Sequence, residues 1–341
     1  MSHTTNNFTA LRLLAALMVL FSHMFAISGR PEPLALPSST FGALAVLIFF
    51  SVSGYLITAS WLRDPSPLRF LSRRLLRLWP AMAVAFVLTM LVLSPLVTGK
   101  SLPQLFTNLQ YTKAFTNLLF YPNYRTFDAF AGTGLQIAAI NGSLWTIPLE
   151  FLCYLLLLAI AKLSRSYLKY AVPAFIAIIL AVFIVRGGEA ALATMKHPGT
   201  WYFFPRFSLF FFTGSLFAIY PELLSPRILF AALVTGIILL FASQFTLGYL
   251  LLVPVASIAV GTSSWPCINR LDGYGDYSYG TYLYAWPVQQ CITLYLGAST
   301  SVFILFGWSA ALTLCLAALS WYLVEQPALA LKPRAAKTPK H

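Results

Sequence analysis

The stretch FTALRLLAALMVLFSHMFAISG, from Phe8 to Gly29, is the first long apolar segment of the chain. A helix crosses a bilayer with about 20 mostly apolar residues, so this segment is predicted to span a membrane. Its only ionisable side chains are Arg12 and His23. The interval between them makes about three helical turns, which places both on one face about 16 Å apart. Because charged groups inside a spanning helix are costly, this face is predicted to line protein or a wet cavity.

The composition extends this interpretation to the whole chain. Hydrophobic residues make up 59% of the sequence and charged residues only 9%, whereas a soluble domain has about 25% charged residues. The net charge of +13 would indicate a nucleic-acid partner in a soluble protein, but here the positive-inside rule explains it. We therefore expect membrane lipid and no nucleic acid as a partner. The four cysteines form no CxxC pair, so they are interpreted as core residues and no metal site is predicted.

Hydropathy predicts an all-α integral membrane protein with about ten transmembrane helices. The expected spans lie near residues 10–29, 40–62, 76–97, 143–162, 170–185, 201–219, 228–243, 245–262, 280–296 and 302–324. Basic residues gather in the segments on the same side as the N-terminus, which predicts that both termini lie inside. Residues 1–330 are expected to form one transmembrane domain and residues 331–341 a short basic cytoplasmic tail.

Arginines mark the connection between the second and third spans. Arg69, Arg73 and Arg77 repeat every four residues, which aligns them on one helical face, and Arg74 lies beside them. Guanidinium groups bind phosphates in a bidentate manner. The same loop also fits topology anchoring and attraction to anionic lipid. The residues alone leave both interpretations open.

The longest segment between spans, residues 98–142, is predicted to lie outside. It combines aromatic residues with Asn, Thr and Gly, which favours stacking on sugar rings but equally fits an interfacial aromatic belt. The aromatic residues are Tyr111, Phe115, Phe120, Tyr121, Tyr124 and Phe127.

Six blocks of sequence, in this order, resemble the membrane acyltransferase-3 family, which includes bacterial O-antigen and exopolysaccharide O-acetyltransferases. The blocks are RLLAALMVLFSH (12–23), FFSVSGYLI (49–57), RRLLRLWP (73–80), NGSLWTIPLEF (141–151), GDYSYGTYLYAWP (275–287) and WYLVEQPAL (321–329). The resemblance covers nearly the whole chain. It implies a ten-helix enzyme of the bacterial inner membrane, in the form without an added SGNH domain. Such an enzyme moves an acyl group, usually acetyl from cytoplasmic acetyl-CoA, to a hydroxyl of a carbohydrate or lipid-linked glycan.

The chemistry of that transfer singles out His23. An attacking hydroxyl needs a base, and histidine is the commonest choice because its pKa lies near neutrality. Of the four histidines, His23 alone lies inside a predicted span. It is predicted to act either as the base or as a nucleophile that forms a transient acyl-imidazole. The sequence does not choose between the two.

Glu150 is the third predicted catalytic residue, with His23 and Arg12. By helical rise it lies at about the depth of His23, where a carboxylate would orient the imidazole. Arg206 is a competing partner for Glu150, through a plain ion pair.

Four residues are predicted to bind the substrate. Small side chains beside Gly54 allow close helix approach, so packing explains the two serines among them equally well. The four are Ser51, Ser53, Trp145 and Arg206.

On the inner side, the arginines are expected to meet the phosphates of CoA, whose flexible arm would extend along the Arg12 face to His23. Asp276 is expected to cap the ninth span, and Glu325 to tie the arginine helix in place. The residues predicted to bind acyl-CoA are Arg69, Arg73, Arg74, Arg77, Tyr277 and Ser278.

A secondary transporter or lipid flippase is the alternative function, since buried charges also form ion or substrate paths. The absence of a convincing inverted repeat argues against it. So does the scarcity of intramembrane carboxylates, of which Glu150 is the only clear one.

Overall fold

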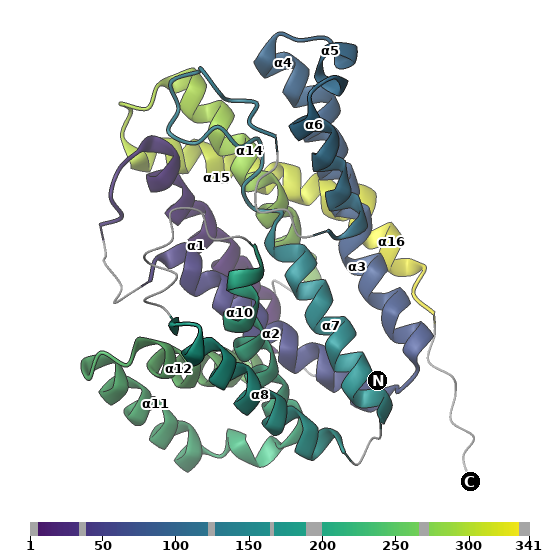
Figure 1. Ribbon diagram of the computed structural model, residues 1–341, viewed down its shortest axis with the longest axis vertical. Coiled ribbons are helices and arrows are strands. Elements are labelled where there is room, and N and C mark those ends of the chain that lie inside the picture. The colour runs from purple at the N-terminus through teal and green to yellow at the C-terminus, as the bar shows by residue number, and fades with distance from the viewer. Residues whose placement is uncertain are drawn as a thin grey trace.

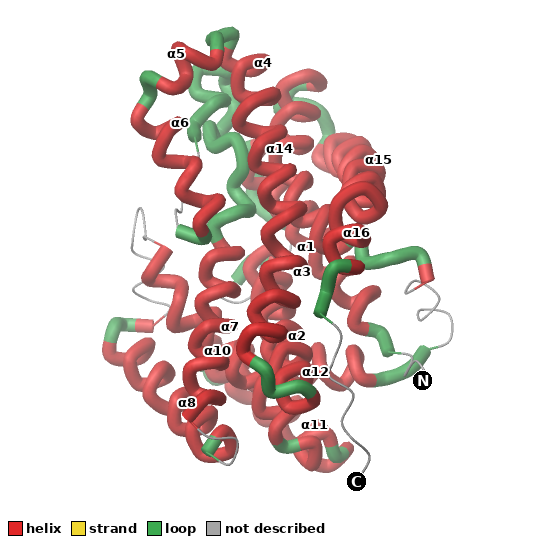
Figure 2. Tube along the Cα trace, turned by 90° about the vertical axis from the view of Figure 1, so that its right-hand side faces the viewer, coloured by secondary structure: helices red, strands yellow, loops and turns green. Residues whose placement is uncertain are grey.

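The computed structural model describes residues 6–33, 39–121, 127–163, 167–188, 200–265 and 273–333. These parts of the chain fold almost entirely into helices, with no strand among them (Figures 1 and 2). The long helices are α1 (Phe8–Ser28), α2 (Phe41–Arg63), α3 (Pro67–Val87), α7 (Thr146–Leu163), α8 (Leu168–Val185), α10 (Thr200–Ile219), α11 (Pro226–Phe241), α12 (Phe245–Thr262), α14 (Ser278–Leu296) and α15 (Val302–Ser320).

Each predicted span coincides with one of these helices, so the all-α membrane fold is confirmed. By length and composition, seven described helical segments are able to cross a membrane. The helix α11 is apolar but shorter than the others, and α7 and α14 are not among the seven. The chain is therefore a multi-pass membrane protein, while the count of ten spans and the inside position of the termini stay predictions.

Two helices extend beyond their predicted bounds. The helix α3 begins at Pro67, nine residues before the predicted start at residue 76, because Pro67 occupies the first helical turn, where a missing N–H costs nothing. It continues through the π-helical turn η1 (Leu88–Leu93) into α4 (Ser94–Thr98). The helix α15 likewise continues through η5 (Trp321–Glu325) into α16 (Gln326–Ala330). The predicted arginine loop is therefore mostly helix.

The centre of the bundle depends on close approach between α2 and α10. A Cβ atom added to Gly54 would lie 1.8 Å from the carbonyl oxygen of Phe211, and one added to Gly214 would lie 2.0 Å from that of Ser51. Glycine at both positions lets the two backbones touch, as predicted for Gly54. The helix α1 packs on α2 on one side and on α14 on the other.

The segment between α4 and α7 begins with short helices at the end of the molecule away from the first turn of α3 (Figure 1). They are α5 (Leu102–Phe106), α6 (Leu109–Ala114) and the 3₁₀ turn η2 (Phe115–Leu119). Tyr111 is fully buried among Phe106, Phe115 and Phe127, and its hydroxyl donates to the carbonyl of Met90 at 2.7 Å. Tyr111 and Phe127 are therefore core residues of the segment and are not free to stack on a sugar, whereas Phe106 is exposed.

The remaining aromatic residues predicted for this segment have different surroundings. Phe120 stacks on Phe151 with ring centroids 4.4 Å apart, whereas Tyr121 is exposed. Tyr124 lies outside the described residues.

Candidate functional site

A cavity of about 290 Å³ opens between α1, α2, α3, α7 and α14, and α16 and the residues after it close one side. Its walls differ in character. One end is cationic, one wall carries a carboxylate with two hydroxyls, and the remaining surface is mostly apolar and aromatic. The cationic end is formed by Arg12, Arg74, Arg77 and Lys332.

Asp276 organises the cationic end. Its carboxylate accepts an ion pair from Arg12 of α1 at 2.8 Å and another from Arg77 of α3. Arg77 also pairs with Glu325 of η5 at 3.0 Å, as predicted for Glu325. Burial by itself would raise the pKa of the Asp276 carboxyl, but the two guanidinium groups and hydrogen bonds from Ser278 outweigh it and hold the pKa at about 2.

The start of α14 depends on the same carboxylate. The backbone N–H and the hydroxyl of Ser278 donate to Asp276 at 3.3 Å and 2.5 Å, which satisfies a free donor at the helix end. The N-cap position itself belongs to Tyr277 and not, as predicted, to Asp276, so the carboxylate acts from one residue further out. Ser278 and Asp276 both line the cavity, and the hydrogen bonds between them fix the position of Ser278. Tyr277 does not line the cavity. Its hydroxyl donates to the carbonyl of Tyr274 and lies 3.1 Å from that of Tyr322, at the exposed surface.

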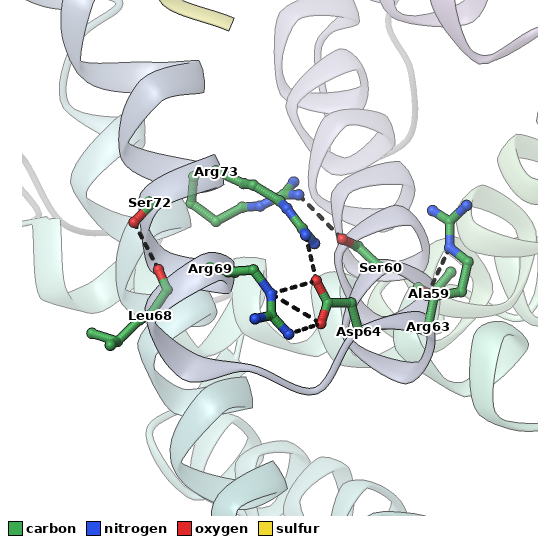
Figure 3. A network of polar contacts seen from close by, with 9 residues as sticks. Ala59, Ser60, Arg63, Asp64, Leu68, Arg69, Ser72 and Arg73 are labelled. Atoms are coloured by element: carbon green, nitrogen blue, oxygen red, sulfur yellow. Dashed lines mark hydrogen bonds and ion pairs between the residues drawn. The ribbon is translucent and has the colours of Figure 1, made fainter. Parts of the chain in front are cut away.

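The predicted row of arginines on α3 divides between two places. Arg69 and Arg73 both pair with Asp64, just after the end of α2 (Figure 3). Hydrogen bonds from these arginines lower the pKa of the Asp64 carboxyl to about 2. Neither residue lines the cavity. Arg69 and Arg73 are therefore separated from the cavity that Arg77 lines, because a local carboxylate holds both guanidinium groups at the α2–α3 turn. Their contact with acyl-CoA stays a prediction.

Glu150 occupies the carboxylate wall with two hydroxyl partners. Ser53 and Tyr154 each donate to the same oxygen of Glu150 at 2.5 Å, and their own oxygens lie 3.0 Å apart. Ser53 thus lines the cavity as predicted. Glu150 was predicted to orient His23, but the hydrogen bonds that its carboxylate accepts come from these hydroxyls.

His23 lies beyond the other end of the cavity. Its ring packs edge-on against Trp286 of α14 with centroids 4.6 Å apart, and its Nδ1 atom is buried without a hydrogen-bond partner. The cavity ends one turn earlier on α14, at Tyr282, whose hydroxyl shares a 2.5 Å hydrogen bond with that of Thr146. The predicted open path from Arg12 to His23 is therefore not formed in this structure, because bulky rings fill it.

The indole of Trp286 is itself fixed by the segment before α7. Its Nε1 donates to the carbonyl of Ala139 at 2.9 Å, and Gln290 donates to the carbonyls of Ile137 and Ala139. A Cβ atom on Gly142 would lie within 2.7 Å of the indole. The segment before α7 thus lies against the same region of α14 that contacts His23.

Three predicted substrate-binding residues lie away from the cavity. Ser51 donates to the carbonyl of Leu47 and packs in the α2–α10 contact. Trp145 packs against Phe203 and Phe207, with ring centroids 5.0 Å and 5.7 Å away. Arg206 is buried within α10. None of the three lines the cavity, so their contact with substrate stays a prediction.

Some residues of the cavity were missed by the sequence reasoning. Tyr154 lies one helical turn after Glu150, so the i, i+4 rule was a usable signal. Asp276 was expected to be a cap, and its link to two arginines has no local sequence signature. Lys332 was assigned to the basic tail, and nothing in its surrounding sequence points to a cavity.

Comparison with known proteins gives a consistent picture. The sequence model of the acyltransferase-3 family, described as an acyltransferase domain, matches residues 5–322. An O-acetyl transferase of Shigella phage Sf6 is 35% identical over 335 residues, which cover 95% of this chain and 96% of the relative. Nodulation protein 10 of Rhizobium leguminosarum bv. viciae is 30% identical over 361 residues, which cover 96% and 94%. No solved structure matches significantly.

Proposed function

The chain belongs to the acyltransferase-3 family, and from that premise we propose that it is a membrane-embedded O-acyltransferase whose donor is an acyl-CoA, with acetyl as the expected group. The proposed acceptor is a hydroxyl of a carbohydrate or lipid-linked glycan on the outer side of a bacterial inner membrane. The transporter or flippase alternative is set aside, because the family and its relative are transferases.

The observation that carries this proposal is the charge distribution of the cavity. Its cationic end contains four basic side chains, while Asp276 and Glu150 are the carboxylates among its lining residues. Guanidinium and ammonium groups in a partly dry site bind phosphates strongly. The rest of its lining is mostly apolar and aromatic, which suits the thioester arm of an acyl-CoA better than a second charged group. This arrangement supports a donor that enters with its phosphates at Arg12, Arg74 and Arg77.

The proposed chemistry uses His23 at the far end. The acceptor oxygen attacks the thioester carbonyl carbon, the C–S bond breaks, and the hydroxyl proton passes to the imidazole. The imidazolium then returns this proton to the thiolate of CoA. In the other form left open by the sequence, the imidazole takes the acyl group first and the acceptor hydroxyl removes it.

His23 and the cavity must come into contact for either form to operate. Tyr282 and Trp286 stand one turn apart on α14 between them. We place the opening step at the hydrogen bond between Tyr282 and Thr146, because it holds the ring at which the cavity ends. Glu150 stays in the proposal as a group of the cavity wall that accepts hydrogen bonds from hydroxyl or amide donors.

The test compares cells that express the wild type with cells that express His23→Ala, by mass analysis of their surface glycans. Loss of general base catalysis lowers rates by about 10²–10⁴-fold, so O-acetyl groups should be absent from the variant. Thermal unfolding of both purified proteins serves as the control, since loss of the edge-on contact with Trp286 should cost only about 0.5–1.5 kcal/mol. A variant that is folded and still acetylates the glycan would refute the role of His23.

A further inference from the structure

Lys332 lies two residues after α16, and with Leu329 it lines the cavity beside the arginines of α3. The helix α16 packs against α3, which carries Lys332 towards Arg74 and Arg77. Its side chain is exposed, so it stands at the mouth of the cavity and not in its interior. The match to the family's sequence model ends at residue 322, ten residues before Lys332.

The charges around Lys332 are unbalanced. The groups that face this region are the cations Arg12, Arg73, Arg74 and Arg77 and the carboxylates Asp276, Glu325 and Asp64. Arg12 and Arg77 pair with Asp276, Arg77 also pairs with Glu325, and Arg73 pairs with Asp64. Among the described residues, Arg74 and Lys332 have no carboxylate within ion-pair distance, and Arg74 donates only to the hydroxyl of Ser60 at 3.3 Å.

This imbalance has a measurable consequence for Lys332. Partial desolvation of the ammonium at the mouth of the cavity, followed by repulsion from Arg77, Arg74, Arg73 and Arg12, lowers its pKa to about 8. Like charges gathered in one place destabilise one another unless an anion joins them. The mouth of the cavity therefore has the electrostatic character of an anion site.

We propose that Lys332 is a donor-binding residue, whose ammonium, together with the guanidinium of Arg74, holds a phosphate of the acyl donor at the mouth of the cavity. This inference rests on the proposed acyl-CoA donor. A lysine binds phosphate as a compact point charge on a flexible stem, without the fixed geometry of arginine. It therefore needs no precise orientation from the backbone, which suits a residue beyond the end of α16. The phosphate of an anionic lipid headgroup has the same chemistry, so the experiment must separate the two sources.

The experiment measures binding of radiolabelled acetyl-CoA to the full chain in phosphatidylcholine nanodiscs, from pH 7 to pH 9.5. This range lies above the second pKa of phosphate, which is about 6. The variants are Lys332→Gln and Lys332→Arg, and the matched control is Lys169→Gln, an exposed lysine at the start of α8 that does not line the cavity.

We expect the Lys332→Gln variant to bind acetyl-CoA about tenfold more weakly at pH 7, since one charge-assisted contact is lost. The wild type should lose affinity as the pH rises above about 8, because the ammonium loses its proton. Lys332→Arg should show no such loss, since its guanidinium stays charged. Lys169→Gln should match the wild type. Acetyl-pantetheine, which lacks the phosphates, should bind wild type and Lys332→Gln equally.

Other outcomes overturn the inference in distinguishable ways. Equal affinity of wild type and Lys332→Gln for acetyl-CoA would refute the role of Lys332 and leave the proposed function intact. An effect of Lys332→Gln that appears only when phosphatidylglycerol is added to the nanodiscs would assign the phosphate to lipid instead. No binding of acetyl-CoA to the wild type would refute the proposed function itself.

Discussion

Two aspartates in this molecule each pair with two arginines, but they connect very different parts of the chain. Asp64 pairs with Arg69 and Arg73, five and nine residues away, at the turn between α2 and α3 (Figure 3). Asp276 pairs with Arg12 and with an arginine of α3, so it joins three helices that are far apart in sequence. The same chemistry thus gives a local cluster at Asp64, here called the staple, and a contact between distant helices at Asp276, here called the junction.

Solvent exposure does not separate the two clusters. The side chain of each aspartate is 12% exposed, and each carboxyl has a pKa of about 2. The two clusters differ in the surroundings of the arginines that lose their partner when the carboxylate is removed. Without Asp64, its arginines remain at the surface and reach water. Without Asp276, Arg12 and Arg77 remain together in the wall of the cavity. The comparison shows that the contribution of an ion pair to stability depends on whether its arginines can reach water once the carboxylate is removed.

Replacement of Asp276 by Asn should have the largest effect. Removal of one partner from a buried ion pair leaves uncompensated charge and costs about 3–5 kcal/mol. We expect a large fall in the thermal unfolding temperature of the purified protein in detergent. An unfolding temperature close to that of the wild type would mean that the Asp276 junction contributes no more than a surface pair.

Acid should weaken the Asp276 junction in a narrow range of pH. The carboxyl has an ordinary pKa of 3.8 and a pKa of about 2 in the folded protein, so its stabilisation is fully present above about pH 4 and is lost as the pH falls towards 2. The full pKa shift corresponds to about 2.5 kcal/mol of the free energy of unfolding. The measurement is the unfolding temperature between pH 2 and pH 6, and Asp276→Asn should flatten the acid limb of that curve. An unchanged acid limb in the variant would assign it to other carboxyls.

Replacement of Glu325 by Gln should have a smaller effect than Asp276→Asn. Arg77 keeps its pair with Asp276, and the amide oxygen of the new side chain still accepts the hydrogen bond from Ser320. Loss of one charged hydrogen bond corresponds to about 1.5 kcal/mol of stability. Denaturant or thermal unfolding of Glu325→Gln and Asp276→Asn under the same conditions ranks their losses of stability. A larger effect from Glu325→Gln would mean that Glu325 and not Asp276 is the main partner of Arg77.

Replacement of Asp64 by Asn should have the smallest effect. Arg69 and Arg73 lie on the first turns of α3 and outside the cavity, so both guanidinium groups can turn towards solvent, where water and salt replace the lost pairs. We expect an unfolding temperature indistinguishable from that of the wild type at 0.15 M salt. A fall as large as that of Asp276→Asn would remove the distinction between staple and junction.

The sequence predicted several elements of the site because their signals are local. Apolar length located every long helix, and the four-residue spacing of the arginines placed them on one helix. The attachment of the arginine helix by Glu325 was also predicted, and Asp276 was correctly placed at the start of α14, although the N-cap itself is Tyr277. The role of His23 stays a prediction from chemistry, because its ring lies outside the cavity.

Other elements could not be predicted because they depend on how the helices pack. Spacing along α3 does not reveal that Asp64 holds Arg69 and Arg73 while Arg77 turns to a different carboxylate. Ser51 and Ser53 lie two residues apart, yet one packs against α10 and the other hydrogen bonds to Glu150. Rotation of a helix about its axis decides such outcomes, and an almost uniformly apolar helix encodes that rotation only weakly.

By itself, the sequence determined that this chain is a helical membrane protein with an arginine-rich end, because hydrophobicity and charge act residue by residue. Only the tertiary structure decided which of those charges share a cavity, and that Tyr282 closes it before His23. The reason is physical. A carboxylate selects its arginine partners by distance in space, and residues such as Arg12, Arg77 and Asp276 come within reach only after α1, α3 and α14 have packed together.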